Sequence, residues 1–397
     1  MTATVRRVAR LAKPLAQAIR AGHPWIYDRA LPRLPAVAPG DVVVIADDSG
    51  PLACAFADPG SPIRARVLDL DPDAALDEAW VAARIRAAAD ARRGDPTLAE
   101  STGLRLVHGE NDFCPGLVVD LYAEVAVAVL DGAGAAAFWR PRLDTVWRAI
   151  EDAGYPVAGA WLRAIRGGSG GAHGEAVRGE VPEHVEISEN GAHFAVDVRR
   201  GQKTGFFLDQ RQNRLLVRHH AAGAEVLNLF CYTGGFSVHA ALGGARRVTS
   251  VDLAAPAVAA AEDNFRRSGV ASAGHQFVAA DAFEYLERAA AERRRWDLVV
   301  VDPPSFAPSE RTRPRALAAY ERLAGQALAV TAPAGLLAFA SCSSHIGEGD
   351  LLSLLASAAA AARRPLRVRH VLGAASDHPI LPAFPEGRYL KFVMAAT

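Results

Sequence analysis

The stretch EVLNLFCYTGGFSVHAAL, residues 225–242, decides the fold class. Its first part, EVLNLF, is a short apolar run typical of a buried strand, and GFSVHAAL reads as a helix. Between them, CYTGG is a tight turn whose glycines, Gly234 and Gly235, let a ligand approach the backbone closely. A strand, a glycine turn and a helix in this order predict one unit of an α/β sheet.

The same alternation continues toward the C-terminus. Further apolar runs predict strands, with helical segments between them, at 246–252, 275–281, 296–302 and 335–342. Strands separated by helices pair in parallel, so we expect a doubly wound, Rossmann-like sheet. The last two predicted strands, 366–373 and 388–395, have no full helix between them. The sheet should therefore end in an antiparallel pair.

Before residue 191 the predicted strands and helices do not alternate in this way. Alternating strands at 41–47 and 63–71, separated by turns rich in proline and glycine, predict a small β-rich module. A helix at 77–94, a hairpin-like stretch at 104–130 and a helix near 135–154 predict a small α+β domain. The glycine-rich stretch 166–180 predicts a flexible loop. The predicted domains are thus 1–72 (β-rich), 73–190 (α+β) and 191–397 (α/β).

Composition narrows the class of protein. Half of the 397 residues are hydrophobic, which permits large cores and excludes wholesale disorder. The formal net charge is zero, so bulk charge does not argue for nucleic acid, although 41 of the 44 basic residues are arginine, which binds phosphate bidentately. The four cysteines are far apart, which indicates neither disulfides nor zinc and suits a reducing cytosol: Cys54, Cys114, Cys231 and Cys342.

No targeting or membrane signal is evident. The N-terminal stretch is basic but has no apolar core, and no apolar run is long enough to span a bilayer. The histidines show no metal-ligand spacing, so we expect no metal. These observations predict a cytoplasmic protein without a membrane partner.

Polar residues stand where the predicted strands of the α/β sheet end. In doubly wound sheets, ligands bind at this edge. The acid at Asp252 follows Gly234 by 18 residues, about where a carboxylate meets ribose hydroxyls. The G-x-G-x-x-G pattern is absent, which disfavours NAD, whereas strand-end aspartates are also common helix caps. The strand-end residues are Asn228, Phe230, Asp252, Asp281, DPPSF at 302–306 and Cys342.

Segments throughout the chain resemble one family, the class I S-adenosylmethionine-dependent 23S rRNA cytosine-5 methyltransferases. In the α/β domain these are GQKTGFFLDQRQNR (201–214), VLNLFCYTGGFSVHA (226–240), VDPPSFA (301–307) and SCSSHI (341–346). HPWIYDRAL (23–31) resembles the start of the family's N-terminal PUA RNA-binding module, RLVHGENDFCPGLVVDLY (105–122) its middle domain, and DHPILPAFPEGRYLKF (377–392) its C-terminal end.

The resemblance implies the cofactor and the partner. It implies S-adenosylmethionine as cofactor, and 23S rRNA or a large-subunit precursor as substrate. It also implies RNA binding by residues 1–72, where Arg6, Arg7 and Arg10 are candidate phosphate contacts. The oligomeric state stays open, a homodimer included.

The resemblance also implies catalysis by a thiolate. Cytosine C5 is a poor nucleophile, but addition of the Cys342 thiolate to C6 makes C5 an enamine-like carbon that attacks a methyl donor. Asp302 is expected to hold N3 protonated, and the prolines after it fix the loop. Phe306 is expected to stack on the extruded base, and Pro304 lies with it on the substrate side.

The implied cofactor contacts come from several segments. The sheet supplies three of them: the turn lies beneath the methionine part, Asp252 binds the ribose, and Asp281 binds the adenine amine. Residues before the first strand fold over the ligand. The set is Lys203, Thr204, Gln210, Asn228, Phe230, Tyr232, Thr233, Gly234, Asp252, Asp281, Ala282 and Pro303. For Lys203 and Gln210, a purely polar surface role is the alternative.

Two other functions are weighed against this one. The chain could be an rRNA base-nitrogen methyltransferase, because (N/D)-P-P-(Y/F) loops also serve transfer to amino groups; Cys342 disfavours this. It could be a non-catalytic RNA-binding or ribosome-assembly factor, which the intact site residues disfavour. Ser305 stands where a related group has a second cysteine, so a two-cysteine release is not supported. No residue is assigned as the base that removes the C5 proton; for His345 a structural role is the alternative to that of base, and Cys231 is expected to pack.

Overall fold

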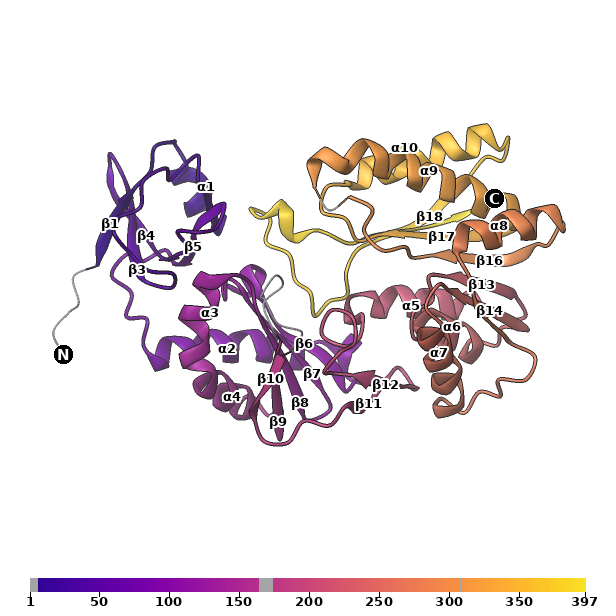
Figure 1. Ribbon diagram of the computed structural model, residues 1–397, viewed down its shortest axis with the longest axis horizontal. Coiled ribbons are helices and arrows are strands. Elements are labelled where there is room, and N and C mark those ends of the chain that lie inside the picture. Colours follow the sequence, from indigo (N-terminus) through magenta and orange to yellow (C-terminus); the bar gives the residue numbers. More distant parts are fainter. Residues whose placement is uncertain (1–5, 164–173, 308) are drawn as a thin grey trace. The chain divides into compact units, whose positions relative to one another are not determined.

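The computed structural model describes residues 6–163, 174–307 and 309–397, which form two compact units (Figure 1). Unit 1 comprises Met1–Ile187, Val196–Leu208 and Ser376–Gly387. Unit 2 comprises Ser188–Ala195, Asp209–Ala375 and Arg388–Thr397. The chain thus passes from one unit to the other five times. The domain boundaries at 72 and 190 stay predictions. The glycine-rich stretch predicted as a flexible loop lies outside the described residues as far as residue 173, and its later part, Gly174–Arg178, is a strand instead of a loop.

The first part of unit 1 is a small β-rich module. Its sheet has the order β1-β3-β4-β5-β2, with β1 parallel to β3 and the other pairs antiparallel. Alternating apolar residues of the central strands point into a core of their own, together with Ile19 and Leu31. The elements are β1 (Arg7–Arg10), α1 (Ala16–Arg20), β2 (Trp25–Tyr27), β3 (Val42–Asp47), β4 (Gly50–Ala57) and β5 (Ile63–Asp69).

The second part of unit 1 is a five-stranded sheet packed against helices, in the order β10-β9-β8-β7-β6. The stretch predicted as one hairpin contains three strands, and the helix predicted near 135–154 is divided in two by a short turn. The elements are α2 (Glu78–Arg93), β6 (Gly103–His108), β7 (Leu117–Tyr122), β8 (Val125–Leu130), α3 (Ala133–Trp139), α4 (Leu143–Asp152), β9 (Gly159–Arg163) and β10 (Gly174–Arg178). A hairpin, β11 (His184–Glu189) and β12 (Ala192–Asp197), follows.

The two parts of unit 1 share a core. Phe56 and Leu68 of the β-rich module belong to the same buried cluster as the helices and strands of the second part. Arg66 of β5, only 3% exposed, donates to Glu110 at 2.6 Å and to Asp131 at 2.7 Å. Removal of residues 1–72 would therefore expose apolar surface and buried acids of the second part. The role of the β-rich module is better tested by single substitutions.

The segment Ser376–Gly387 joins unit 1 although unit 2 flanks it in the sequence. Asp377 is fully buried, and its Oδ2 accepts a hydrogen bond from the backbone N–H of Arg105 at 3.0 Å. Arg92 donates to the carbonyl oxygen of Asp377 at 2.8 Å, and Leu381 N–H donates to Asn111 at 3.0 Å. These bonds hold the segment against residues that precede it by more than 250 positions.

Unit 2 is the predicted Rossmann-like domain. Each strand from residue 225 onward lies within four residues of its predicted bounds, and helices separate the strands before the last pair, as expected. The elements are α5 (Arg211–His219), β13 (Glu225–Leu229), α6 (Gly235–Leu242), β14 (Arg247–Asp252), α7 (Ala255–Arg267), β15 (Gln276–Ala279), α8 (Ala282–Ala291), β16 (Trp296–Val301), α9 (Arg313–Val330), β17 (Thr331–Ser341), α10 (Glu348–Ala361), β18 (Arg367–Leu372) and β19 (Lys391–Ala396).

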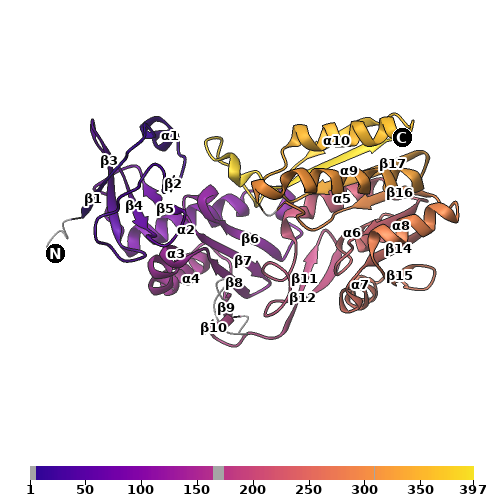
Figure 2. The ribbon, with the colours of Figure 1, turned by 45° about the horizontal axis from the view of Figure 1, so that its top comes forward.

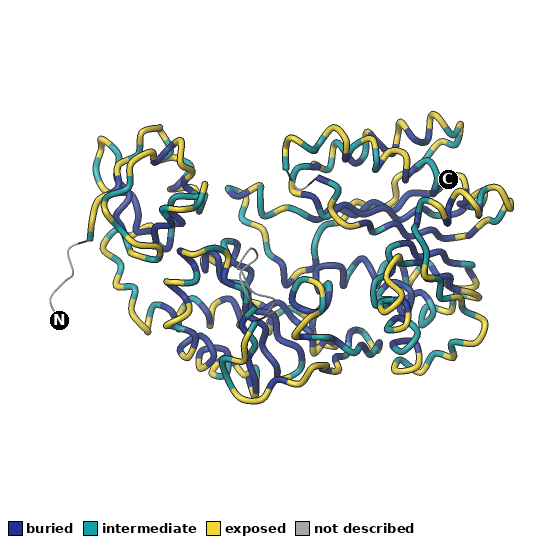
Figure 3. Tube along the Cα trace, viewed as in Figure 1, coloured by how far each residue is buried: buried dark blue, intermediate teal, exposed yellow. Residues whose placement is uncertain are grey.

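The sheet of unit 2 has the order β15-β14-β13-β16-β17-β19-β18. The first five strands in this order are parallel, and the last two, β18 and β19, pair antiparallel, as predicted; β19 is also antiparallel to β17. Helices α8, α9 and α10 cover one face and α5, α6 and α7 the other (Figures 1 and 2). The strands form the buried layer between them (Figure 3). The strand order reverses between β13 and β16, which is where such sheets bind ligands.

None of the helices in the described part of the chain combines the length and the apolar character that crossing a membrane requires.

Candidate active site

The turn after β13 has an unusual backbone. Phe230, Tyr232 and Gly234 have φ values of 58°, 47° and 82°. Left-handed φ is rare for aromatic residues and often marks a functional loop. The turn is closed by a hydrogen bond from Gly234 N–H to the carbonyl of Cys231 at 2.8 Å. A Cβ on Gly234 would lie 2.8 Å from the Cβ of Ala261 in α7, so only glycine fits.

The acid that ends β14 is bound to this turn. Oδ2 of Asp252 accepts a hydrogen bond from Tyr232 N–H at 2.9 Å, and Oδ1 accepts one from Ala254 N–H at 2.9 Å. The side chain stays partly exposed, and the next residue, Leu253, is 73% exposed. A carboxylate and an apolar side chain thus stand together beside the turn. This pairing suits a nucleoside, which has hydroxyls on the sugar and an apolar face on the base.

A buried ion cluster supports the same turn from below. Arg214 of α5 donates to both carboxylate oxygens of Glu189, at 2.6 and 2.7 Å, and its side chain lies against Gly235. His239 Nε2 lies 3.1 Å from Glu189. Burial raises the pKa of Glu189, but Arg214 and His239 outweigh burial and hold the pKa well below its usual range. Glu189 therefore joins α5, through Arg214, to α6, through His239, and holds both helices around the turn.

Three of the predicted cofactor residues lie behind this surface or cap a helix. Asn228 is 1% exposed and donates to Ser237 at 2.9 Å, so it supports the turn from inside. Asp281 is the N-cap of α8, where Oδ1 accepts from the N–H groups of Phe283 and Glu284 at 2.8 and 3.1 Å. Ala282 is buried in the first turn of that helix. A helix cap is the alternative role given above for an aspartate at a strand end. Both of these hydrogen bonds use Oδ1 of Asp281 and neither uses Oδ2.

Asp302 follows β16 and begins the DPPSF loop. Gln210 donates to Asp302 Oδ1 at 3.0 Å and accepts from Asn213 at 2.6 Å. Because Gln210 is 2% exposed, its amide orients Asp302 rather than a ligand at the surface. Pro303 is buried, and Pro304 is exposed at the tip of the loop.

Cys342 follows the last residue of β17, and it is the one cysteine of the four that is not buried. Burial raises the pKa of the Cys54 thiol to about 11, and it raises the pKa values of Cys114 and Cys231 further. Only the thiolate is a good nucleophile, so these three thiols are inert near neutral pH. Cys342 alone combines access with a place at the carboxyl edge of the sheet.

The loops that carry Asp302 and Cys342 are tied together. Ser343 Oγ donates to the carbonyl of Ala307 at 3.0 Å. The hydroxyl of Tyr320, a fully buried residue of α9, accepts from Ser341 Oγ at 3.3 Å and from Phe306 N–H at 3.5 Å. The acid and the thiol predicted as catalytic therefore belong to one connected structure in unit 2.

Phe306 packs against Tyr320, with ring centroids 4.8 Å apart, and lies 6.5 Å from the ring of Phe283. It is half-buried, so its ring supports the loop with one side, and stacking on a base stays a prediction. His345 is paired with Glu310 at 3.3 Å, which fits a structural role better than proton abstraction.

Two predicted cofactor residues, Lys203 and Thr204, belong to unit 1. Thr204 is buried, its hydroxyl donates to Asp120 Oδ2, and it lies 2.8 Å from the Tyr122 hydroxyl. Its side chain is thus engaged inside unit 1, and the geometry does not support a direct contact with a cofactor. Lys203 has a φ of 54°, and its Nζ lies 4.6 Å from the ring centroid of Phe207.

Sequence reasoning missed three residues of the site: Leu253, Tyr320 and Lys391. Leu253 has a detectable signal, since it is an apolar residue directly after the strand-end acid. Tyr320 has none, because its place depends on how α9 packs. Lys391 could have been noticed as the polar start of an otherwise apolar strand, KFVMAA.

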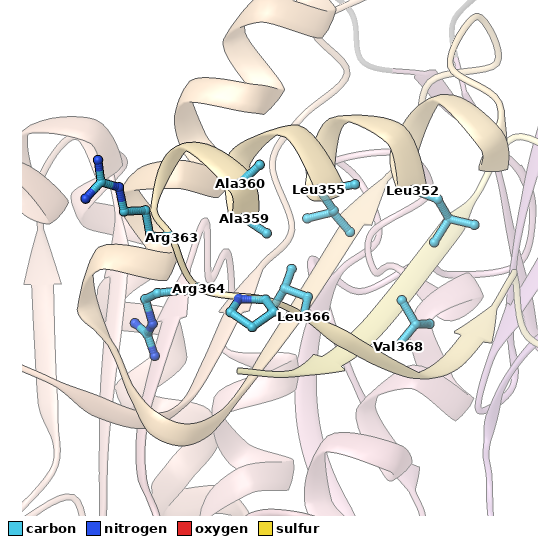
Figure 4. A pocket seen from close by; sticks show the side chains of 10 residues that line it. Leu352, Leu355, Ala359, Ala360, Arg363, Arg364, Leu366 and Val368 are labelled. Atoms are coloured by element: carbon cyan, nitrogen blue, oxygen red, sulfur yellow. The ribbon is translucent and has the colours of Figure 1, made fainter.

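A cavity of about 500 Å³ lies between α10 and β18, away from these strand ends (Figure 4). Apolar side chains such as Leu352, Leu355 and Val368 line most of it, and Arg363 and Arg364 stand at one end. It contains none of the predicted catalytic or cofactor residues, so we do not assign the active site to it.

Comparison with known proteins agrees with this geometry. A family model for S-adenosylmethionine-dependent methyltransferases matches residues 166–370, and a model for PUA-like domains matches residues 9–70. The chain is similar to a ribosomal RNA large subunit methyltransferase of Deinococcus radiodurans, with 40% identity over 97% of this chain and 96% of the relative.

Two further matches extend the comparison. A ribosomal RNA large subunit methyltransferase I of Aeromonas salmonicida is 37% identical over 93% of this chain and 94% of the relative. A solved methyltransferase in complex with SAH superposes with a TM-score of 0.86, at 24% identity, over 98% of this chain and all of that one. The last match concerns the fold alone.

Proposed function

Because this chain belongs to the S-adenosylmethionine-dependent methyltransferase family that includes the ribosomal RNA large subunit methyltransferases, we propose that it methylates C5 of a cytosine in 23S rRNA. The observation that carries the proposal is the half-exposed Cys342, held beside the Asp302 loop by Ser343. Methylation of a base nitrogen needs no nucleophilic thiol, because the nitrogen can attack the donor itself. A ribosomal RNA substrate would place the protein in the cytoplasm.

The residues around the β13 turn fit the cofactor. Asp252 would accept hydrogen bonds from ribose hydroxyls, Leu253 would pack on the adenine ring, and the left-handed turn from Phe230 to Gly234 would hold the methionine part. Oδ2 of Asp281 would accept from the adenine amine. When bound, S-adenosylmethionine supplies an electrophilic methyl group on a sulfonium.

The chain's own groups would activate the base. The Cys342 thiolate adds to C6 of cytosine and forms an S–C6 bond, and the electron pair of the C5–C6 double bond makes C5 nucleophilic. Asp302, as the protonated carboxyl, donates its proton to N3 as negative charge develops there, and takes the proton back when the double bond re-forms. After methylation, a base removes the C5 proton, the double bond re-forms, and the S–C6 bond breaks to return the thiolate.

The proposal is tested by product analysis. Purified protein, S-adenosylmethionine with a labelled methyl group and 23S rRNA lacking the modification should yield 5-methylcytidine after digestion to nucleosides and mass spectrometry. Label on N4 of cytidine, or on another base, would instead indicate a base-nitrogen methyltransferase. No label on either naked rRNA or large-subunit precursors would favour a non-catalytic RNA-binding protein.

Replacement of Asp252 by alanine should weaken binding of S-adenosylmethionine by about 1–3 kcal/mol, the scale of charge-assisted hydrogen bonds. Calorimetric titration with the cofactor measures this. The same carboxylate holds the N–H groups of Tyr232 and Ala254, so Asp252→Asn, which keeps an acceptor oxygen, should lose less. Asp263→Ala, which replaces a partly exposed acid paired with Arg267 on α7, serves as the control. Unchanged affinity in Asp252→Ala would remove this residue from the cofactor site.

The β-rich module should contribute affinity for RNA through surface arginines. Arg6 donates to the carbonyls of Pro72 and Ala74, so it holds the module together, whereas Arg7 and Arg10 are exposed on β1. The double variant Arg7→Ala/Arg10→Ala should bind RNA more weakly. In a plot of log K against the logarithm of the salt concentration, the magnitude of its slope should be smaller by about 1–2. Arg148→Ala, an exposed arginine of α4 paired with Glu78, is the control. A slope equal to that of the unmodified protein would contradict phosphate contacts at these positions.

A further inference from the structure

Lys391 is a buried lysine beside the proposed nucleophile. It begins β19, and its Cα lies opposite that of Ser341, the residue before Cys342. Its exposure is 4%. Its Nζ donates hydrogen bonds to the carbonyl oxygens of Ser343, the residue after Cys342, and of Tyr389 at 2.8 Å. The ammonium group is therefore fixed against the loop that carries the thiol.

The positive charge of Lys391 is incompletely balanced by these bonds. A buried ammonium is stable only when it is paired, and both acceptors are neutral carbonyls. The charged or titratable groups that act on it are Cys342 from the loop after β17, Asp350 from α10 and Arg388 from the segment before β19. Arg388 repels it, and Asp350 is already paired with Arg313 at 2.7 Å. A thiolate at Cys342 would supply the anion that this position needs.

The protonation and the hydrogen-bonding capacity of the Lys391 side chain suit a position beside a thiolate. Burial lowers the pKa of Lys391 to about 8, against the opposing influence of Cys342 and Asp350. The group is therefore mostly protonated at neutral pH and loses its charge as the pH rises through about 8. Of the 44 basic residues in the chain only three are lysines, at 13, 203 and 391. Lysine is compact and has three rotatable donors, so it can bond two carbonyls and still face an anion.

We propose that Lys391 is a positioning residue whose ammonium group holds Cys342 as a thiolate and fixes the Ser343 carbonyl behind it. The inference rests on the proposed role of Cys342 as the nucleophile. A residue that only clamped the loop would leave the acidity of the thiol unchanged, so the two roles are separable.

The test is the pH profile of Cys342 alkylation by iodoacetamide in the full-length protein, without RNA or cofactor. Cys342 is identified by peptide mass spectrometry, and the three buried cysteines react slowly by comparison. In Lys391→Met the midpoint of the profile should rise by about one pH unit or more, with a rate at pH 7 about tenfold lower. Lys391→Arg, which keeps the charge, should retain a midpoint near that of the unmodified protein. The same midpoint in all three proteins would overturn the proposal.

A second measurement needs no change at Lys391. Protein labelled with ¹³C at the lysine ε-carbons gives three signals, one of which should titrate near pH 8. Coupling is reciprocal, so Cys342→Ala should lower the midpoint of that signal and leave those of Lys13 and Lys203 unchanged. An unmoved Lys391 midpoint would overturn the inference. Neither measurement uses RNA. The coupling between Lys391 and Cys342 can therefore be absent in a protein that methylates C5, and it can be present in a protein that does not.

Discussion

Replacement of Cys342 by alanine is expected to abolish methyl transfer to RNA and to abolish the covalent protein–RNA adduct. RNA containing 5-fluorocytosine cannot lose a C5 proton after methylation, so the unmodified protein should be trapped on it as a species of higher mass on a denaturing gel. Loss of the nucleophile removes the covalent path altogether. The rate should therefore fall by several orders of magnitude, where each factor of ten corresponds to about 1.4 kcal/mol of barrier. Cofactor affinity, measured by calorimetry, should barely change.

The matched control is Cys231→Ala. Cys231 lies in the cofactor turn but is 5% exposed, and burial raises the pKa of its thiol. This variant should still form the adduct with fluorinated RNA. Near-normal C5 methylation by Cys342→Ala would show that Cys342 is an ordinary loop cysteine and would remove the mechanism proposed above. An adduct lost in Cys231→Ala but kept in Cys342→Ala would move the nucleophile to the other thiol.

Replacement of Gly234 by alanine should both destabilise unit 2 and remove cofactor binding. Alanine at a φ of 82° costs about 1–2 kcal/mol, and its Cβ would meet Ala261 at 2.8 Å. Relief of that contact would shift α7 or the turn, at a further 1–3 kcal/mol. We expect a loss of about 2–5 kcal/mol in the free energy of unfolding, and cofactor affinity lower by more than tenfold, since the turn holds the Tyr232–Asp252 bond.

Gly325→Ala is the control for this substitution. Gly325 lies inside α9, and a Cβ there meets no atom within 4 Å. Alanine favours a helix over glycine by about 0.5–1 kcal/mol, so this variant should gain stability and keep its cofactor affinity. Denaturant unfolding and calorimetry on both variants measure the two effects. A Gly234→Ala protein with normal affinity would show that the turn tolerates a side chain and that the cofactor lies elsewhere.

The sequence predicted those parts of the site that depend on local pattern. Asp252, Asp302 and Cys342 were identifiable because each stands where a predicted strand ends, and parallel strands bring their ends to one edge. The glycine turn was identifiable from the same rule. Each of these positions follows from the order of the predicted strands and helices along the chain.

Other parts depend on contacts between distant segments and had no local signal. The importance of Lys391 arises from its register opposite Ser341 on an antiparallel strand, 50 positions later in the chain. The role of Gln210 became clear only through its bond to Asp302. Thr204 and Asn228 look like ligand residues in the sequence, yet their polar groups bond to Asp120 and Ser237 inside the protein. Polar residues near a site can satisfy buried partners as readily as a ligand.

The assignment of Ser376–Gly387 to unit 1 has a consequence for how the protein is made. A ribosome releases the chain from its N-terminal end, so the β-rich module and its neighbouring sheet emerge first. The bonds that Asp377 and Leu381 make to Arg105 and Asn111 must wait until nearly all of unit 2 has emerged. Unit 1 therefore cannot be finished while the chain is growing. A nascent chain stalled within residues 209–375 should be more open to protease around 92–112 than the released protein.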